Sequence, residues 1–548
     1  MKIKSNIGNY EKTYRTWRWK LPTFFNLSSV IDKWADDPKR IAIYWEGDSG
    51  GVKDLTFREL RDYSNQFAGA LVSLGLKKGD KAVILMSRLL EAHIAYLGIV
   101  KTGAVAVPVS QLFAPDALSY VLDNSQAKIL ITTEELRNTL LKKVIPKCRK
   151  LKKVIVLGKA KGKDVPFWDV LLRQDRDFKV AKTKGKDLST FLYTSGTTGM
   201  PKGVMHTHWW LLGNVPQVRF WQDVKPGDMV WCTADLTWIT GLINAFLGPL
   251  SQGATVLSYD GRFDPHRWFK LMESYKVTNL VSAPTAFRML MAEDHKLKKY
   301  KLKLRVVCGI GERVNDEIIR WWERRYGLAV LDGYGQTECM SFICNYPGMK
   351  IKIGSCGKPT PGHVVTILNP DTNREITKPG VRGIVVMGKT SSPVLYQGYW
   401  KNEEKTKETF KGKWYLSGDA GYRDKDGYFW IEGRDDDVIK TSGYRVGPYE
   451  VESTLHRHPA VAESAVIGKP DKILGHIIKA LVVLKRGHSG TPALIKELQQ
   501  FVKKHLAAYK YPKEIIFVKE LPKTQSGKIK RKILRLAEEE AFKKSGKK

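Results

Sequence analysis

Short apolar runs alternate with longer stretches of helical periodicity along the first 300 residues. Apolar residues recur at helical spacing in 57–74, 89–101 and 267–276. Around them lie short apolar runs that indicate buried strands, at 82–85, 104–109, 128–132, 153–157, 255–258 and 279–282. Buried strands that alternate with helices are typical of parallel sheets covered by helices. The pattern predicts an α/β fold.

A different arrangement follows Arg434. Three adjacent acids, 435–437, follow a strand-like run at 428–431. Beyond them the pattern predicts a helix that begins near Pro448, two strands (462–467 and 478–484), a helix (493–506) and a strand (514–518). Because single cores stop growing near ~250–300 residues, 548 residues imply more than one domain. We expect a large multi-lobed domain, 1–434, and a small α+β domain, 435–548.

The chain is strongly basic. Its 92 Lys and Arg residues against 56 Asp and Glu residues give a net charge of +36. Such a field attracts nucleic acid, an anionic membrane surface or small phosphorylated molecules, and a solvated lysine-rich surface of the hyperthermophile kind explains it equally well. No basic run interleaved with aromatic residues and no zinc-finger spacing is present, so nucleic acid is not expected as a partner.

Neither cysteine nor hydropathy patterns indicate export or a membrane span. The six cysteines lack paired spacing, which predicts reduced, mostly buried thiols. The longest charge-free apolar run, 236–250, falls short of the ~20 residues that span a bilayer. His206 and His208, beside two tryptophans, are expected to be core or helix-start residues, and no metal-ligand role is assigned to them. We expect a cytoplasmic protein, and a homo-oligomer remains open.

The sharpest local signal is the string Tyr-Thr-Ser-Gly-Thr-Thr-Gly-Met-Pro-Lys-Gly at 193–203. Glycines let backbone N–H groups turn toward anionic oxygens, hydroxyls supply further donors, and Lys202 adds a positive charge. The spacing is not that of a Walker A loop. Taken alone, a Ser/Thr/Gly loop is more often a surface linker, so this string requires support from elsewhere in the chain.

That support comes from a resemblance. The string is similar to the phosphate loop of the acyl-adenylate-forming enzymes, the family of acyl-CoA synthetases, luciferases and peptide-synthetase adenylation domains. Further strings match in the family's order over nearly the whole chain, at 311–312, 332–338, 415–419, 433–440 and 522–528. The resemblance implies a small C-terminal domain that rotates about a hinge at Asp436, with ATP, Mg²⁺ and coenzyme A as cofactor and co-substrates.

Roles for single residues follow from the same resemblance. Tyr334 would face the purine, Thr337 the α-phosphate, and Glu338 would hold Mg²⁺, while Asp419 and Arg434 would contact the ribose. Outside these strings each acid would be an ordinary surface charge. The full ATP-binding set implied is Thr194, Ser195, Gly196, Thr197, Thr198, Gly199, Lys202, Gly311, Glu312, Arg313, Asp332, Gly333, Tyr334, Gly335, Gln336, Thr337, Asp419, Arg434, Arg445 and Lys528. The family usually has proline where Arg313 stands.

Lys528 is the expected catalytic residue, together with Thr337 and Glu338. The attacking carboxylate and the α-phosphate are both anionic, so a mobile ammonium lowers the barrier between them. By composition alone Lys528 is one more lysine in a basic tail. The string Pro-Lys-Thr-Gln-Ser-Gly-Lys-Ile, which resembles the family's last motif, distinguishes it.

The acceptor and the acid are expected from finer matches. Residues 234–241 resemble the acetyl-CoA and medium-chain acyl-CoA synthetase branch, and no carrier domain is expected after Lys548, so coenzyme A is the predicted acceptor. The implied coenzyme A contacts are Thr240, Ser442, Gly443 and Tyr444. Two alternatives remain open: a protein that loads an adenylated acid onto a carrier protein, and a non-catalytic polyanion-binding protein.

Gly335 is the basis of the expected acid. Acetyl-CoA synthetases usually have tryptophan directly before Gln-Thr-Glu, whereas this chain has Gly335 there. An open pocket floor would suit propionate, butyrate, a hydroxy or branched short acid, or a medium-chain acid. Trp238, Thr240 and Ile310 are expected to form the remaining wall.

Overall fold

The computed structural model describes residues 5–194, 200–390, 392–434, 437, 439–441, 444–471, 475–506, 510–524 and 528–545, with the backbone only at 440, 444, 445, 475 and 545. The chain divides into two compact units. The first contains the described residues up to 194, 200–364 and 388–413, and the second those of 365–387 and 414–545.

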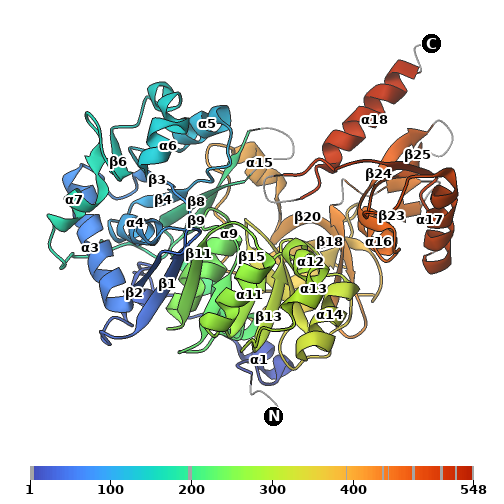
Figure 1. The fold of residues 1–548 in the computed structure, drawn as a ribbon, viewed down its shortest axis with the longest axis horizontal. Helices are drawn as coiled ribbons and strands as arrows, with labels where there is room; N and C mark the ends of the chain where they lie inside the picture. Colours follow the sequence, from blue (N-terminus) through green and yellow to red (C-terminus); the bar gives the residue numbers. More distant parts are fainter. Residues whose placement is uncertain are drawn as a thin grey trace. The chain divides into compact units, whose positions relative to one another are not determined.

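The first unit alternates strands and helices (Figure 1). Its elements are α1 (Tyr10–Thr16), α2 (Ser29–Asp32), β1 (Ile41–Gly47), β2 (Val52–Thr56), α3 (Phe57–Ser73), β3 (Lys81–Leu85), α4 (Leu90–Lys101), β4 (Val105–Pro108), α5 (Pro115–Ser125), β5 (Ile129–Thr133), α6 (Glu134–Asn138), η1 (Leu140–Lys142), η2 (Ile145–Lys147), β6 (Lys153–Leu157), β7 (Val165–Pro166), α7 (Phe167–Leu172), β8 (Leu188–Thr194), β9 (Lys202–Thr207), α8 (Trp209–Pro216), η3 (Gln217–Trp221), β10 (Met229–Cys232), α9 (Ile239–Gly241), η4 (Leu242–Leu247), α10 (Gly248–Ser251), β11 (Thr255–Asp260), α11 (Pro265–Ser274), β12 (Asn279–Ser282), α12 (Pro284–Ala292), α13 (Asp294–Leu297), β13 (Val306–Ile310), α14 (Asp316–Tyr326), β14 (Val330–Gln336), β15 (Met340–Cys344), β16 (Lys358–Pro359), α15 (Glu403–Glu408) and β19 (Phe410–Lys411).

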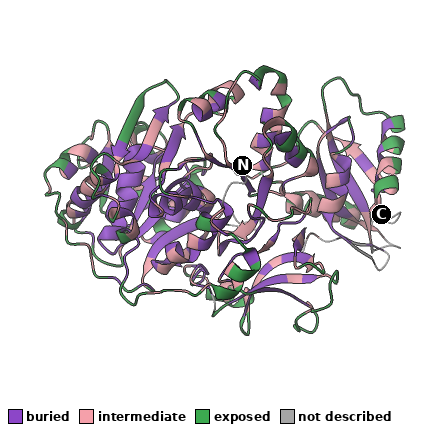
Figure 2. Ribbon diagram, turned by 90° about the horizontal axis from the view of Figure 1, so that it is seen from below, coloured by how far each residue is buried: buried purple, intermediate pink, exposed green. Residues whose placement is uncertain are grey.

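Two mostly parallel sheets form the body of this unit. One has seven strands in the order β7-β6-β5-β3-β4-β8-β9, and the other has nine in the order β16-β15-β14-β13-β12-β10-β11-β1-β2. The strands of both sheets are largely buried (Figure 2). Four tryptophans, Trp231, Trp268, Trp321 and Trp322, pack in the core beside the larger sheet. The predicted α/β class is confirmed.

Local sequence explains where the predicted helices begin. The Thr56 hydroxyl accepts a hydrogen bond from the Glu59 N–H, and the Glu59 carboxylate accepts one from the Thr56 N–H at 2.8 Å, which caps α3 at both donors. Asp264 caps α11, and Pro265 occupies its first position. The predicted strands are β3, β4, β5, β6, β11 and β12, each within two residues of its expected bounds.

The described strands of the second unit pair mostly antiparallel, except that β25 and β26 run parallel, and helices accompany them. Its elements are β17 (Val365–Leu368), β18 (Gly383–Gly388), β20 (Trp414–Arg423), β21 (Phe429–Arg434), β22 (Ile439–Thr441), β23 (Tyr444–Val446), α16 (Pro448–Leu455), β24 (Val461–Asp471), β25 (Gly475–Leu484), α17 (Pro492–His505), β26 (Glu514–Phe517) and α18 (Arg531–Ser545). The order helix, strand, strand, helix, strand after 447 is the predicted one. The expected boundary at 434 follows β21 and stays a prediction.

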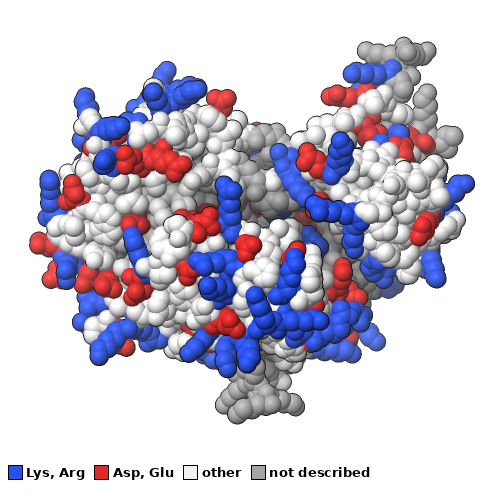
Figure 3. Space-filling model, viewed as in Figure 1, with Lys and Arg blue, Asp and Glu red and all other residues white. Residues whose placement is uncertain are grey.

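Cysteine state and surface charge follow the sequence. None of the six cysteines, all of which lie within the described residues, forms a disulfide, and all six are buried. Among the described helices, none combines the length and the apolar character that crossing a membrane requires. Lysine and arginine side chains are spread over the visible face with acids between them, and no single groove gathers them (Figure 3).

Candidate active site

The first site element is the β8–β9 hairpin. The two strands pair antiparallel, with Thr194 directly opposite Lys202. The Tyr193 hydroxyl donates to Asn124 Oδ1 at 2.7 Å and so fixes the end of β8. Thr194 and Lys202 therefore flank the loop on opposite strands. The expected loop contacts Ser195, Gly196, Thr197, Thr198 and Gly199 lie outside the described residues.

The second element is the β14–β15 hairpin, which carries the 332–338 string. Gln336 pairs with Met340, so Thr337 and Glu338 lie at the tip of the turn, where both are partly exposed. The Tyr334 ring contacts Phe342 edge-on, with centroids 5.2 Å apart. The hairpin thus presents a hydroxyl and a carboxylate at one point.

A third segment, 396–400, joins the two hairpins. The Trp400 N–H donates to Gly203 O, and the Gln397 N–H to Met205 O, both at 2.8 Å, so the segment lies along β9. At its other end the Tyr396 N–H donates to Glu338 O at 2.8 Å. Sequence reasoning missed this segment. Its only signal was a cluster of Tyr and Trp residues in a stretch without helical or strand periodicity.

Tyr399 connects the charged groups of the two hairpins. Its hydroxyl donates to Glu338 Oε1 at 2.6 Å, and the Lys202 ammonium lies 5.7 Å from the centroid of its ring. Burial, and next the Glu338 carboxylate, raise the pKa of Tyr399 well above its usual value. Tyr399 therefore remains a hydrogen-bond donor to Glu338 at every physiological pH.

His206 lies on β9 beneath this site. Its ring is buried and stacks on Trp210 with centroids 4.5 Å apart. Burial lowers the pKa of His206 to about 3, opposed by a weaker interaction with the Thr337 backbone. The imidazole is therefore neutral and is a core residue, in agreement with the sequence interpretation.

The residues after β13 are engaged within the protein. The Glu312 carboxylate accepts from the Thr285 hydroxyl at 2.7 Å and pairs with Arg288 at 3.0 Å. Arg313 donates to Gly354 O. Gly311 is exposed and has φ +94°, a conformation that suits glycine. Of the expected ATP contacts here, Gly311 is exposed, while Glu312 and Arg313 are partly exposed and already bonded within the protein.

Asp332 is a buried acid at the same sheet edge. Its Oδ2 lies 3.4 Å from the Val314 N–H. Burial raises the pKa of Asp332 to about 7, and Arg313 partly opposes that rise. The neighbouring Gly333 is also buried, with Trp221 where a side chain would be. We therefore assign the Asp332 carboxyl to the support of the loop after β13.

The expected acyl-pocket residues lie at the carboxyl ends of β10 and β13. Both strands are parallel and are separated by β12 alone, so their ends lie roughly 10 Å apart. Ile310 ends β13 and is 6% exposed. Trp238 precedes α9, and the Thr240 carbonyl within α9 accepts the Cys232 thiol at 3.9 Å. Ligands of open α/β sheets bind at such an edge.

Gly335 does not form an open floor, and this corrects the expectation from the sequence. A Cβ on Gly335 would lie 1.8 Å from Met340 O and 2.7 Å from Ser341 Cα. The space is therefore filled by the backbone of β15, and glycine is required for the close approach of the two strands. Met340 itself has φ +52°, which is uncommon for a residue with a side chain.

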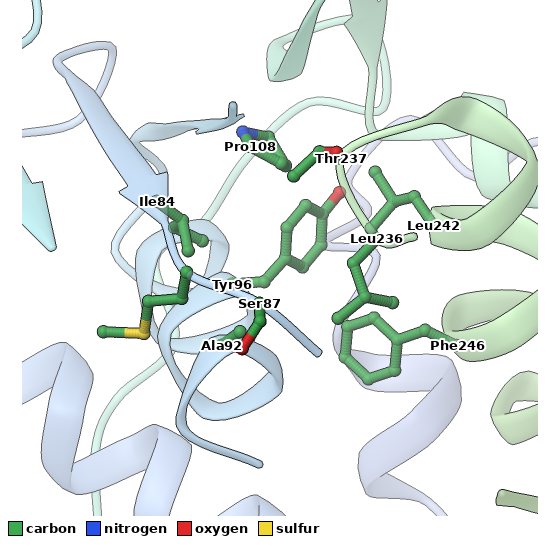
Figure 4. A pocket seen from close by; sticks show the side chains of 10 residues that line it. Ile84, Ser87, Ala92, Tyr96, Pro108, Leu236, Thr237, Leu242 and Phe246 are labelled. Atoms are coloured by element: carbon green, nitrogen blue, oxygen red, sulfur yellow. The ribbon is translucent and has the colours of Figure 1, made fainter. Parts of the chain in front are cut away.

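An apolar pocket lies beside the 234–241 loop (Figure 4). In this view the Tyr96 ring lies between Ile84 on one side and Leu236 and Phe246 on the other. The space left for a water-sized sphere is ≈ 10 Å³, about one water molecule. The lining is Ile84, Met86, Ser87, Ala92, Tyr96, Pro108, Leu236, Thr237, Leu242 and Phe246.

The hydroxyls in this pocket wall already have partners. The Ser87 hydroxyl donates to Asp260 Oδ2 at 2.7 Å, and Tyr96 Oη lies 2.6 Å from Thr190 Oγ1. Thr237 bonds Asp235 Oδ1 through its hydroxyl at 2.7 Å. The pocket is thus a narrow apolar space whose polar groups are fixed.

In the second unit, the two expected ribose contacts face each other. Asp419 on β20 and Arg434 on β21 are register partners, and Arg434 Nη1 lies 3.8 Å from Asp419 Oδ1. Arg434 also donates to Ser417 O at 3.1 Å, and the Ser417 hydroxyl accepts from the Asp419 N–H at 3.0 Å. A carboxylate and a guanidinium are therefore presented together at one strand end.

Lys528 lies in a loop whose ends are tied together. The Thr524 N–H donates to Lys528 O at 2.7 Å, and the Lys528 N–H donates to Thr524 Oγ1 at 3.0 Å. The Lys528 side chain is exposed and forms no ion pair with any described residue. Asp436, Ser442 and Gly443 lie outside the described residues, and Tyr444 and Arg445 are described only as backbone of β23.

Comparison with known proteins places these strings in a family. The AMP-binding enzyme model matches residues 31–400, and the AMP-binding enzyme C-terminal domain model matches 450–528. Together they span the phosphate-loop, hairpin and Lys528 strings. The Asp419–Arg434 pair falls between the two matched ranges.

Individual relatives cover nearly the whole chain. The acetyl-coenzyme A synthetase of Bacillus subtilis (strain 168) is 39% identical over 553 residues, which is 97% of this chain and 95% of that one. The human mitochondrial acyl-coenzyme A synthetase ACSM3 is 38% identical over 97% of this chain and 93% of its own. The anthranilate CoA ligase AuaEII, solved with anthranoyl-AMP, superimposes with a TM-score of 0.87 at 31% identity over 95% of this chain and 99% of that one.

Proposed function

The chain belongs to the AMP-binding enzyme family, as an AMP-forming acyl-CoA ligase, and from this we propose that it activates a short aliphatic carboxylic acid. In the first step a carboxylate oxygen attacks the α-phosphorus of ATP, and pyrophosphate leaves. In the second step the coenzyme A sulfur attacks the acyl carbon, AMP leaves, and the thiol proton goes to solvent. The observation that carries the proposal is the Lys202–Tyr399–Glu338 arrangement.

That arrangement suits ATP. Lys202 and Thr194 flank the phosphate loop and supply a charge and a hydroxyl to polyphosphate oxygens. Thr337, at the tip of the second hairpin, supplies a further hydroxyl for the α-phosphate. In the second unit Asp419 accepts hydrogen bonds from the ribose hydroxyls. Lys528 offsets the charge that develops as the carboxylate attacks.

Glu338 fits Mg²⁺. Carboxylate oxygen is a preferred ligand of Mg²⁺, which is usually held by one or two carboxylates together with substrate phosphates. The described residues contain no cluster of three or more metal-binding side chains, so a single carboxylate completed by ATP is the arrangement they support. Tyr399 binds one Glu338 oxygen and orients the other. When bound, the ion would neutralise phosphate charge.

The acid is proposed from the apolar pocket. Its lining residues Leu236 and Thr237 directly precede Trp238, so an acid whose carboxylate lies near Trp238 can extend its chain toward Leu236 and Thr237. Because the space holds about one water molecule, it favours short chains, at most propionate or butyrate with some movement of the lining side chains, over long chains. The Ser87 and Tyr96 hydroxyls in the wall are already bonded to Asp260 and Thr190, so the pocket offers a terminal hydroxy acid no evident partner, and the assay compares such an acid with the plain chain. We place the reaction in the cytoplasm, in short fatty acid metabolism, where ATP and coenzyme A are supplied.

The experiment is an acid panel with ATP and Mg²⁺. Acetate, propionate, butyrate, 4-hydroxybutyrate and hexanoate are each scored for pyrophosphate release without coenzyme A and for AMP release with it. We expect pyrophosphate release with a short acid and AMP release only after coenzyme A is added. AMP release that needs a carrier protein and ignores coenzyme A would replace the proposal with carrier loading, and no acid-dependent pyrophosphate at all would overturn it.

A further inference from the structure

The loop that carries Lys528 is held at its base by an apolar cluster. Ile529, directly after Lys528, packs against the cluster of Ala465, Ile467, Leu481 and Leu521. Leu534, in the first turn of α18, packs on the same cluster. The Lys530 N–H donates to Pro522 O at 2.8 Å, which closes the loop. These contacts hold the loop against the sheet. They do not set the direction in which the chain enters α18.

A largely buried ion pair, in which the Arg531 side chain is 21% exposed, fixes the direction in which the loop enters α18. Arg531, the first residue of α18, donates to Glu452 through Nε at 3.1 Å and through Nη2 at 2.6 Å. Glu452 is on α16, its side chain is 4% exposed, and its Oε1 also accepts the Val466 N–H at 2.7 Å. A guanidinium held at two points has one orientation, unlike an ammonium held at one.

Stability alone is a poor explanation for such a pair. Replacing a buried ion pair with apolar residues is often neutral or stabilising, because desolvation offsets the attraction. What the pair provides is geometry: it connects three elements, α16, β24 and α18, at a point three residues from Lys528. One turn further along α18, Arg535 pairs with Asp437, the residue after the expected hinge position.

We propose that Arg531 and Glu452 are positioning residues for Lys528 in the adenylation step. The inference rests on the proposed role of Lys528. A displacement of about 1 Å at a catalytic group can lower a rate by roughly 100-fold. Loosening the start of α18 should therefore displace the Lys528 ammonium and slow adenylation. Thioester formation from a supplied acyl-adenylate does not need that ammonium and should be spared.

The test separates the half-reactions in the full-length protein. Arg531→Met and Glu452→Gln are each assayed for acid-dependent pyrophosphate release and for thioester formation from synthetic acyl-adenylate with coenzyme A. We expect the adenylation kcat to fall by roughly 10–100-fold with little change in the KM for ATP, and thioester formation to stay within about 2-fold. Arg531→Lys, with a single ammonium in place of the two-point guanidinium, should have an adenylation kcat between those of wild type and Arg531→Met.

Two further measurements make the outcome decisive. Lys479→Met is the matched control, since Lys479 also pairs with α18, at Glu538 (2.7 Å), but ten residues beyond Lys528; it should lower the melting temperature without separating the half-reactions. The double variant Arg531→Met/Glu452→Gln should be no worse than either single one, because both break the same pair.

The inference is overturned if the variants slow both half-reactions equally, as general damage would, or slow neither. Glu452→Gln is nearly isosteric and carries the test if Arg531→Met does not fold. Lys528→Ala is run in parallel: if it keeps adenylation, the proposed role of Lys528 is wrong and the inference falls with it. If Lys528→Ala loses adenylation while Glu452→Gln retains it, only the positioning role is wrong.

Discussion

The hydroxyl of Tyr399 donates a 2.6 Å hydrogen bond to the carboxylate of Glu338, across 61 residues of sequence. Hydrogen bonds to ionised acceptors are short and strong, so one carboxylate oxygen is held while the other is directed. The same tyrosine lies against Lys202. A single side chain outside every recognised motif therefore sets the geometry of the proposed metal ligand.

Tyr399→Phe should raise the Mg²⁺ concentration needed for adenylation by about 10–100-fold, because groups that orient a metal ligand typically contribute that much to affinity. A Mg²⁺ titration of pyrophosphate release measures it. Tyr275→Phe is the matched control. Tyr275 makes a similar 2.7 Å bond to Glu46 on β1, near the opposite end of the larger sheet from β14, so this variant should leave the titration unchanged. An unaltered Mg²⁺ requirement in Tyr399→Phe would show that Glu338 needs no orientation.

Asp332→Asn should remove a pH dependence of stability. Burial raises the pKa of Asp332 to about 7. Between pH ~4 and pH ~7 the carboxyl is therefore protonated in the folded protein and ionised in the unfolded protein. Folded protein then binds more protons, and the free energy of unfolding falls as pH rises from about 4 to about 7, by up to ~4 kcal/mol at ~1.4 kcal/mol per pH unit.

The check is urea unfolding of both proteins at several pH values. Relative to wild type, Asp332→Asn should gain stability steadily up to pH ~7 and no further above it. A constant difference between the two proteins across this range would mean that Asp332 ionises normally.

Lys528→Ala should lose adenylation by roughly 100–1000-fold, since removal of one transition-state charge partner has effects of this size. Thioester formation from supplied acyl-adenylate should be retained. Acetylation of Lys528 removes the same charge, so it should silence the first step reversibly. Equal losses in both steps would disprove the role.

Gly335→Trp should now inactivate the enzyme toward every acid. The sequence alone suggested that an indole would shorten the acyl pocket and spare ATP contacts, but a side chain at Gly335 meets the β15 backbone. Even Gly335→Ala should displace the hairpin that carries Thr337 and Glu338 and raise the KM for ATP. Selective loss of long acids in Gly335→Trp, with ATP binding intact, would restore the earlier interpretation.

Ala92→Leu should instead change chain-length preference. Ala92, on α4, lines the apolar pocket, and each methylene accommodated there is worth about 1–3 kcal/mol. We expect kcat/KM for butyrate to fall by at least ~10-fold while acetate is retained. The KM for ATP reports general damage. If butyrate and acetate fall together, the acyl chain lies elsewhere.

Much of this could be predicted because it is encoded locally. The strands β3 to β6 are continuous apolar runs, and the α3 start is a capping box within four residues. The two failures at the site have a common cause. The surroundings of Gly335 are set by Met340 in the following strand, β15. No glycine, proline or asparagine between these two residues indicates that the chain turns back there. The partner of Glu338 is Tyr399, whose segment pairs with β9 some 200 residues earlier in the chain. The periodicity of apolar residues does not predict such a long-range contact.

The 396–400 segment has a consequence for engineering of the chain. Backbone bonds from Tyr396 to Glu338, from Gln397 to Met205 and from Trp400 to Gly203 fix its register. Side chains along an extended segment alternate in direction, so adding or removing one residue there would turn Tyr399 away from Glu338. Length changes should therefore be tolerated in an exposed turn such as 159–163 but not here, and libraries that vary loop length for new substrates should leave this stretch constant.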